Sequence, residues 1–460
     1  MSRRRCSSMS EGSLFGPIFV PDELREAVGD RAWLQAMLDA EAALAAALAG
    51  EGAIPASEAE AIRSRCKADL FDISEIGRDG RASGNPVVPL VKALTAEVAE
   101  TSDEAAYQVH RGATSQDITD TAAMLVAARS LDLILPELDA LADHCARLAD
   151  EHRVTLMAGR TLMQQALPVT FGLKAAGWLV ALLEARRGLL RMKETGLAAQ
   201  LGGAAGTLAS LGEEGPGVLS RFARELGLAE PVVPWHSSRG RISELAGVLA
   251  VCAGAVEKLA GDVILLSQTE VGEVAEPTGD GRGGSSTLPH KRNPILSVEA
   301  VAGSRRARAD AHTLQSSMNH EHERAAGAWH VEWEALGGVL AATGGSVAAM
   351  REALGGIEVY PDRMRENLDV TGGLIMAENV TTVLTGELGR LEAHELVKAA
   401  CKRVAQNGTG LKQELLSEPT VGLVISEDEI DAALEPGHYL GSSELFVNRA
   451  LKVYREEVGS

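Results

Sequence analysis

Aromatic side chains are scarce in this chain, and a long uninterrupted apolar run is absent. Phenylalanine, tyrosine and tryptophan make up only 3% of the residues, whereas glycine occurs 48 times. The core must therefore be built from aliphatic and small side chains, which let helices approach one another closely. No run reaches the roughly 20 consecutive apolar residues that a membrane-spanning helix needs. We therefore expect no membrane partner.

Cysteine is also rare. The chain contains 5 cysteines, which are widely spaced and form no CxxC pair: Cys6, Cys66, Cys145, Cys252 and Cys401. An odd number at such spacing does not suggest a disulfide framework or a zinc site. The sequence therefore predicts free thiols in a reducing compartment, and we expect a cytoplasmic protein.

Positive charge is deficient. Lysine and arginine number 44 against 64 aspartates and glutamates, so the formal net charge is −20. This balance argues against nucleic acid or an anionic membrane as a partner. It leaves room for a small anionic substrate in a local basic pocket. Residues 1–13 carry three arginines with no apolar run behind them, which is unlike a secretory signal. We expect a disordered tail there, with Met9 as an alternative start.

What the chain does contain is helical periodicity. At 460 residues it is too long for one core,. Short amphipathic helices fill the first third, and longer ones follow over 117–152, 242–266, 295–318 and 332–354. Pro136 should kink or break the first of these. After residue 356 the helices become shorter again. We predict an all-α protein with three domains, at 1–112, 113–356 and 357–460, whose long helices form a central bundle.

The most informative stretch is GGSSTLPHKRNP at 283–294. Paired glycines and serines do not continue a helix, and the two prolines stiffen the far end. The predicted loop presents a hydroxyl, an ammonium and a carboxamide close together. A hydroxyl can move a proton, while lysine and asparagine can neutralise charge on carboxylate oxygens. The simpler alternative is a solvated Gly/Ser loop with a basic end.

A second stretch, HRGATSQD at 110–117, leads from a polar turn into a helix. The N-terminus of a helix offers backbone donors and a positive dipole, so carboxylates bind well there. The alternative is ordinary helix capping by Thr114 or Ser115. A third stretch, NHEHER at 319–324 with His330, is the densest group of histidines and carboxylates. Its spacing is not HExxH, so we favour a hydrogen-bonded edge of the site over a metal centre.

These stretches resemble the motifs of the fumarase/aspartase superfamily. GSSTLPHKRNP is similar to its GSSxMPxKxNP loop, with Leu288 where methionine is usual, and HRGATSQD is similar to its HxGxTSxD motif. The resemblance covers nearly the whole chain beyond the first dozen residues. Within the superfamily the pattern is most similar to the bacterial 3-carboxy-cis,cis-muconate cycloisomerases, with adenylosuccinate lyases the nearest relatives.

The resemblance implies a three-domain, all-helical homotetramer whose active sites are shared between subunits. It implies catalytic roles for Ser285 as the group that moves the carbon-bound proton, for Lys291 and Asn293 as stabilisers of the aci-carboxylate intermediate, and for His110. It also implies that a small polycarboxylate substrate is held by Asn85, Thr114, Ser115, Arg160, Thr161 and Arg324. No cofactor and no metal is expected.

One departure from the family pattern bears on the reaction. Adenylosuccinate lyases carry a histidine just after GRT, as an acid for the leaving group, whereas this chain has Leu162. Leucine cannot transfer a proton. The departure favours lactonisation, which expels no nitrogen group. It also leaves room for a lyase whose leaving group needs no protonation, such as nitrite, or for another acid such as His110 or His330. A purely structural homologue is a further alternative.

Overall fold

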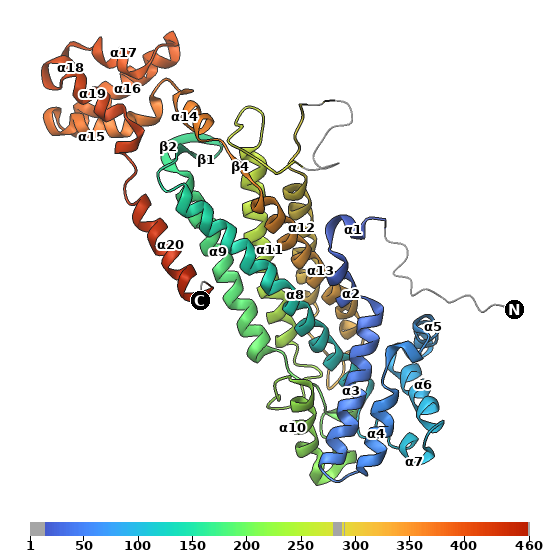
Figure 1. The fold of residues 1–460 in the computed structure, drawn as a ribbon. Coiled ribbons are helices and arrows are strands. Elements are labelled where there is room, and N and C mark those ends of the chain that lie inside the picture. Colours follow the sequence, from blue (N-terminus) through green and yellow to red (C-terminus); the bar gives the residue numbers. More distant parts are fainter. Residues whose placement is uncertain (1–13, 279–287, 289, 459–460) are drawn as a thin grey trace. The chain divides into compact units, whose positions relative to one another are not determined.

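Helices make up most of the fold in the computed structural model, which describes residues 14–278, 288 and 290–458 (Figure 1). The elements are, in chain order, α1 (Gly16–Phe19), α2 (Asp22–Ala27), α3 (Asp30–Gly50), α4 (Ala56–Arg65), η1 (Ala68–Leu70), α5 (Ile73–Ser83), α6 (Val87–Ala99), α7 (Asp103–Ala106), α8 (Ser115–Glu151), β1 (Leu156–Thr161), β2 (Gln164–Thr170), α9 (Phe171–Arg191), η2 (Met192–Gly196), η3 (Gly203–Ala205), η4 (Ala209–Glu214), α10 (Gly215–Leu226), α11 (Gly240–Leu266), β3 (Val274–Ala275), α12 (Ile295–Ser316), α13 (Ala328–Gly355), β4 (Glu358–Val359), α14 (Pro361–Asp369), η5 (Leu374–Met376), α15 (Ala377–Leu388), α16 (Arg390–Asn407), α17 (Leu411–Leu416), α18 (Pro419–Val424), α19 (Glu427–Leu434), η6 (Pro436–His438) and α20 (Ser443–Glu457). The predicted all-α class is confirmed.

The described residues pack into two compact units. The first takes its residues from Met1–Asp139, Glu184–Glu257 and Glu299–Met350, and the second from Ala140–Leu183, Lys258–Val298 and Arg351–Ser460. Each unit is therefore assembled from segments far apart in the chain. The predicted boundaries of three domains stay a prediction.

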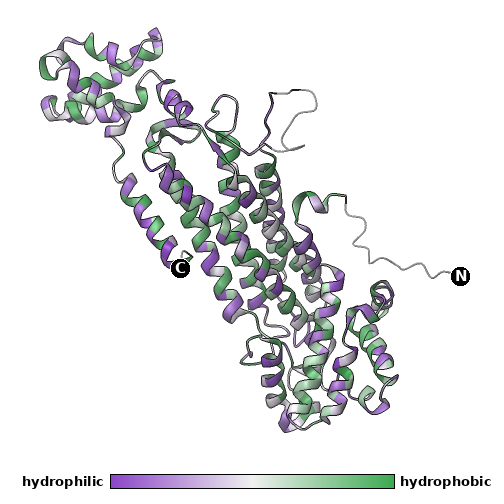
Figure 2. Ribbon diagram, in the orientation of Figure 1, coloured by the Kyte–Doolittle hydropathy of each residue, from purple (hydrophilic) through white to green (hydrophobic). Residues whose placement is uncertain are grey.

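The long helices are amphipathic along their length, and Figure 2 shows hydrophobic and hydrophilic residues alternating around them. In α11 the predicted apolar face is buried, with Leu245, Leu249 and Val256 fully inaccessible. Cys252 lies on the same face, and burial raises the pKa of its thiol to about 12. The four described cysteines, Cys66, Cys145, Cys252 and Cys401, are free thiols.

Small residues bring helices close together in the first unit, as the composition suggested. A Cβ atom added at Gly303 of α12 would lie 2.5 Å from Ser346 Oγ of α13. One added at Gly344 of α13 would lie 2.8 Å from Ile134 Cγ1 of α8. Larger residues at these positions would force the helices apart, so the scarcity of aromatic residues is a requirement of this packing.

Helix α8 runs without interruption through Pro136. The alternative of a break at this proline was therefore wrong. Proline removes one backbone donor from the helix, but packing against neighbouring helices stabilises the segment on both sides. As a result, one continuous element connects the HRGATSQD turn in the first unit to the second unit.

The β1–β2 hairpin was not predicted from sequence. The strands pair antiparallel from Leu156 with Thr170 to Thr161 with Gln164, and the register shifts between Ala158 and Arg160. The predicted all-α class contains no such hairpin. Tertiary contacts explain the difference, because β1 packs against α14 and β2 against η5. A two-stranded hairpin alone is marginal in water.

Two further helical regions bear on the sequence predictions. Helices α15–α19 of the second unit enclose a hydrophobic cluster of their own, which includes Val380, Leu384, Leu411 and Leu415. Helix α3 in the first unit is the one helix in the described part of the chain that is long and apolar enough to span a membrane. It is 61% buried over that window, as core helices of globular domains also are.

Candidate functional site

Asp117 organises the turn before α8. Its Oδ2 accepts hydrogen bonds from the backbone N–H of Thr114 at 2.9 Å and of Gly203 at 2.9 Å, and its Oδ1 accepts one from Gly202 N–H at 2.9 Å. The Nε2 atom of His236 lies 2.6 Å from the same Oδ1. The side chain is fully buried. One carboxylate thus holds the α8 turn against the glycine-rich turn at residues 200–207.

The predicted ligand-binding hydroxyls remain available in this arrangement. Helix capping by Thr114 or Ser115 was the alternative to function, but the side chain that the structure shows bonding at this helix start is Asp117, which reaches back from the first turn to Thr114 N–H,. Both Thr114 and Ser115 are half-buried. Within residues 14–278, 288 and 290–458, neither hydroxyl makes a hydrogen bond. Two hydroxyls beside a helix N-terminus are well suited to bind a carboxylate.

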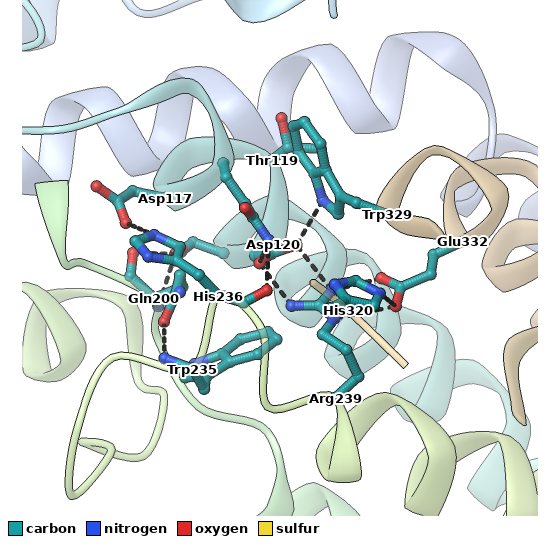
Figure 3. A network of polar contacts seen from close by, with 12 residues as sticks. Asp117, Thr119, Asp120, Gln200, Trp235, His236, Arg239, His320, Trp329 and Glu332 are labelled. Carbon is teal, nitrogen blue, oxygen red and sulfur yellow. Dashed lines mark hydrogen bonds and ion pairs between the residues drawn. The ribbon is translucent and has the colours of Figure 1, made fainter. Parts of the chain in front are cut away.

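Beneath this turn lies a buried network of charges, shown in Figure 3. The Arg239 guanidinium donates to both carboxylate oxygens of Asp120, at 2.8 and 3.0 Å, and its Nε donates to Glu332 Oε1 at 2.9 Å. Trp329 Nε1 donates to Asp120 Oδ1 at 3.0 Å. Burial alone would lower the pKa of Arg239, but the two carboxylates outweigh it and raise this pKa. Helices α8, α11 and α13 are therefore joined at their N-terminal ends.

Burial shifts the pKa values of His320 and Glu332 in opposite directions within this network. Burial raises the pKa of Glu332 despite its ion pair with Arg239. Burial, with the charge of Arg239, lowers the pKa of His320. His320 Nε2 lies 3.4 Å from Glu332 Oε1, so the two side chains form an ion-pair contact. The role of the NHEHER stretch as a hydrogen-bonded edge of the site stays a prediction.

Both terminal nitrogens of Arg324 donate hydrogen bonds to other parts of the chain. Its Nη1 donates to Gln116 Oε1 at 3.0 Å, and its Nη2 donates to the carbonyl oxygen of Ala204 at 2.9 Å. It therefore connects the start of α8 to the glycine-rich turn. Its proposed contact with substrate, shared with Thr114 and Ser115, stays a prediction.

His110 lies in the same unit, with its ring held by a buried carboxylate. Its Nδ1 lies 2.6 Å from Glu41 Oε1 of α3. Burial lowers the pKa of His110, but the charge and hydrogen bond of Glu41 and the charge of Asp117 together raise it above its usual value. Sequence reasoning missed Glu41, because no local pattern relates positions 69 residues apart.

Asn85 has a local structural role. Its Oδ1 accepts hydrogen bonds from the backbone N–H of Val87 at 3.1 Å and of Val88 at 3.3 Å, so it satisfies two free donors at the start of α6,. The preceding Gly84 has φ of 70° and accepts a hydrogen bond from the ring of His330 at 3.0 Å. Asn85 thus lies in the first unit, and its amide donates to the carbonyl oxygen of Ser83 at 3.3 Å. Its contact with substrate stays a prediction.

The remaining predicted residues belong to the second unit. Arg160 forms a two-point ion pair with Glu273, at 2.7 and 3.0 Å, and Asn367 Nδ2 donates to the same carboxylate at 2.7 Å. Thr161 ends β1 and is exposed. Leu162 forms the tip of the hairpin with a φ of 49° and 97% of its surface exposed. An apolar side chain therefore stands where the relatives' acid would be.

Ser285 lies outside the described residues, but the end of its loop is defined. Lys291 is exposed, and Asn293 is half-buried with its carbonyl oxygen accepting from Ile295 N–H at 2.9 Å. Between them, Arg292 pairs with Glu358 at 2.6 Å and donates to the Glu276 carbonyl at 2.8 Å. The arginine therefore anchors this end of the loop.

Among the described residues, three or more histidines, cysteines or carboxylates nowhere form a group that could hold a metal ion. A cavity of about 600 Å³ lies between α15 and α16 of the second unit, lined by Thr381, Arg390, His394 and Lys398 among others. It contains none of the residues that the sequence motifs predicted, so motif and cavity do not coincide.

Comparison with known proteins decides the family. Residues 20–306 match the family model described as lyase, and residues 373–450 match the one described as adenylosuccinate lyase C-terminus. The chain belongs to the lyase family of the fumarase/aspartase superfamily. This confirms the resemblance and the fold that were inferred from the two motifs.

Individual relatives within the family are similar over nearly their whole length. The 3-carboxy-cis,cis-muconate cycloisomerase of Bradyrhizobium diazoefficiens is 46% identical, with 95% of this chain and 97% of the relative covered. The nitrosuccinate lyase of Streptomyces davaonensis is 44% identical, with 97% and 95% covered. The crystal structure of the 3-carboxy-cis,cis-muconate lactonizing enzyme from Pseudomonas putida superimposes with a TM-score of 0.91 at 40% identity, covering 97% of this chain and 99% of that one.

Proposed function

We propose that this enzyme is a 3-carboxy-cis,cis-muconate cycloisomerase. The carrying observation is Leu162, an exposed leucine at the hairpin tip where an adenylosuccinate lyase would place its acid. Lactonisation has no nitrogen leaving group to protonate. Relatives that bear the cycloisomerase name at 46% and 44% identity support the same reaction.

The proposed reaction is an internal addition. An oxygen of one substrate carboxylate forms a bond to a carbon of the conjugated diene, the double bond shifts its electrons to the neighbouring carbon, and that carbon takes up a proton. A γ-lactone results, and no group leaves. Much of the acceleration would come from holding the carboxylate against the double bond. Charge on the other carboxylates needs cationic and hydroxyl partners.

The described residues supply such partners. The hydroxyls of Thr114 and Ser115 stand beside the N-terminus of α8, and the raised pKa of His110 favours its cationic form. Lys291 adds an exposed ammonium from the loop that carries Ser285. We propose Ser285 as the group that moves the carbon-bound proton, with Lys291 and Asn293 stabilising the aci-carboxylate. Asn85, Arg160, Thr161 and Arg324 complete the proposed substrate contacts.

We further propose a cytoplasmic homotetramer in the β-ketoadipate pathway of aromatic catabolism, with sites shared between subunits and a small polycarboxylate as substrate. Shared sites are what the superfamily resemblance implies. The motif residues themselves fall in both units of the chain, with His110, Thr114 and Ser115 in one and Arg160 and Lys291 in the other.

The deciding experiment offers three substrates in parallel to the purified enzyme. We expect loss of the diene absorbance of 3-carboxy-cis,cis-muconate, with a lactone as product and no fumarate, and negligible cleavage of adenylosuccinate. Nitrosuccinate is the second candidate, because a relative at 44% identity is a nitrosuccinate lyase. Fumarate from nitrosuccinate, with the muconate untouched, would establish the lyase instead. No turnover of any of the three would support a structural homologue.

A further inference from the structure

The contact between His110 and Glu41 has features that packing alone does not explain. The two atoms that meet, His110 Nδ1 and Glu41 Oε1, are 2.6 Å apart. Glu41 projects from the middle of α3, and its side chain is 1% exposed, whereas that of His110 is 18% exposed. The carboxylate thus lies inside the unit and the ring lies at its surface.

The carboxylate of Glu41 is buried at a cost to stability. Its other oxygen, Oε2, has no hydrogen-bond partner in the described chain. Its neighbours on α3, Ala40 and Leu44, are apolar and buried. Burying a carboxylate with one oxygen unsatisfied costs free energy that a leucine at this position would avoid. We therefore look for the role of Glu41 in its effect on His110, its one hydrogen-bond partner among the described residues.

The backbone conformation of His110 also indicates a functional constraint at this position. Its φ of 61° lies in the left-handed region, which residues other than glycine seldom adopt,. Strain of this kind persists where the surroundings over-determine a position, and it clusters at functional sites. The left-handed turn places Nδ1 on Glu41. Nε2, the other ring nitrogen, makes no hydrogen bond to any residue that the structure describes.

Two carboxylates face the ring, Glu41 from α3 and Asp117 from α8. Asp117 is already held by Gly202, Gly203 and Thr114 N–H and by His236. Glu41 is therefore the one that can orient the ring directly, by accepting a hydrogen bond from Nδ1–H.

We propose that Glu41 is a positioning residue, which holds His110 doubly protonated and directs its Nε2–H towards a carboxylate of the substrate. This inference deepens the proposed function and rests on it for the identity of the substrate. The imidazolium, held by Glu41 through Nδ1, would present its Nε2–H as a charge-assisted hydrogen-bond donor,. The arrangement differs from ordinary core packing, because its effect disappears when the ring loses its second proton.

The sign of the pH dependence follows from the raised pKa of His110. The imidazolium is present below that pKa and is lost as the pH rises through it. Replacing Glu41 with glutamine removes the charge that stabilises the imidazolium, so the pKa of His110 falls. The alkaline limb of kcat/KM should then move to lower pH. Stability contributed by the pair is fully present below the ordinary pKa of histidine and is lost as the pH rises through the raised pKa of His110,.

The test uses Glu41→Gln in the full-length enzyme. We expect kcat/KM at neutral pH to fall roughly tenfold to a hundredfold, the range of one charge-assisted hydrogen bond. Lowering the pH should restore most of the loss, because acid protonates His110 without help. The control is Asp39→Asn, which makes the same change of charge on the same helix at a residue paired with Arg129. It should leave the profile unchanged.

Two further measurements separate this inference from the proposed function. In a His110→Asn background, Glu41→Gln should have no further effect on kcat/KM, whereas independent structural roles would be additive. Titration of the His110 ring by NMR, assigned with His110→Asn, needs no substrate, and its midpoint should move to lower pH in Glu41→Gln. An unchanged midpoint, or a loss of activity that acid does not restore, would overturn the inference. Failure of the wild-type enzyme to lactonise muconate would overturn the proposed function alone.

Discussion

At the scale of single residues, two aspartates three positions apart on α8 have different roles. Asp117 accepts backbone hydrogen bonds and fixes two turns, whereas Asp120 neutralises Arg239 in the buried network. Both are nearly inaccessible to solvent. Residue type alone does not distinguish them, since each is a carboxylate at the start of the same helix. Their distant partners, from Gly202 at 85 positions from Asp117 to Trp329 at 209 positions from Asp120, make the difference.

The first prediction concerns Asp120. Replacing it with alanine leaves Arg239 buried with Glu332 as its remaining carboxylate and removes the acceptor of Trp329 Nε1. Breaking a buried pair from one side costs about 3–5 kcal/mol. We expect that loss in denaturant unfolding at fixed protein concentration. Glu60→Ala, which breaks the exposed pair with Arg63, should cost about 1 kcal/mol or less,. A similarly small effect for Asp120→Ala would contradict the assignment.

The second prediction concerns Ser285. If this hydroxyl moves the carbon-bound proton, Ser285→Ala should lower turnover at least roughly a hundredfold, the low end for general acid–base catalysis. Helical circular dichroism should be unchanged, because a loop hydroxyl contributes no helix. Ser286→Ala is the matched control in the same loop. Near-normal turnover in Ser285→Ala would exclude the assignment and direct attention to Ser286.

At the scale of elements, the junction between α8 and α9 depends on one glycine. Gly172 lies so close to the preceding chain that an added Cβ atom would be 2.7 Å from the carbonyl oxygens of both Ala149 and His152. Its own N–H donates to His152 O at 2.9 Å. The atoms in the way belong to the backbone and cannot rotate aside. The close turn that follows the hairpin therefore requires a residue without a side chain.

The third prediction follows from this packing. Gly172→Ala should destabilise the protein by about 1–3 kcal/mol, as overpacking a dense region does. Gly177→Ala on the same helix meets no atom within 4 Å. It should instead stabilise by about 0.5–1 kcal/mol, since alanine favours helix over glycine. Thermal unfolding of the two variants side by side measures both signs, and equal effects would show that the junction is not crowded.

At the scale of the whole molecule, the motif residues are divided between two compact units of one chain. The superfamily resemblance implies that several chains complete each site. A shared site has a consequence that no single-chain site has. Two differently inactivated proteins can restore activity when mixed, because some of the mixed sites contain no substitution.

The fourth prediction uses this consequence. Ser285→Ala and Ser115→Ala should each be nearly inactive alone. Unfolded together and refolded, they should regain part of the activity on the substrate that the wild-type enzyme turns over. Each variant refolded separately is the control. Light scattering should show an oligomer, and a fully active monomer would rule out sharing.

The sequence by itself determined the fold class, the helical spans and the two motifs that identify the superfamily. The apolar spacing of α11 and the glycines at 200–207 are local patterns, and such patterns can be recognised from the sequence alone. Leu162 was recognised from the sequence in the same way, because the missing histidine after GRT is visible without a structure.

Only the tertiary structure decided the partners. The hairpin at 156–170 forms because β1 and β2 pack against α14 and η5, which overrides the local expectation. Glu41 meets His110, and Asp120 meets Arg239, across 69 and 119 positions. The sequence around a carboxylate does not indicate which cation it will contact in the folded protein. Burial and distance set that pairing, and both arise only when the chain has folded.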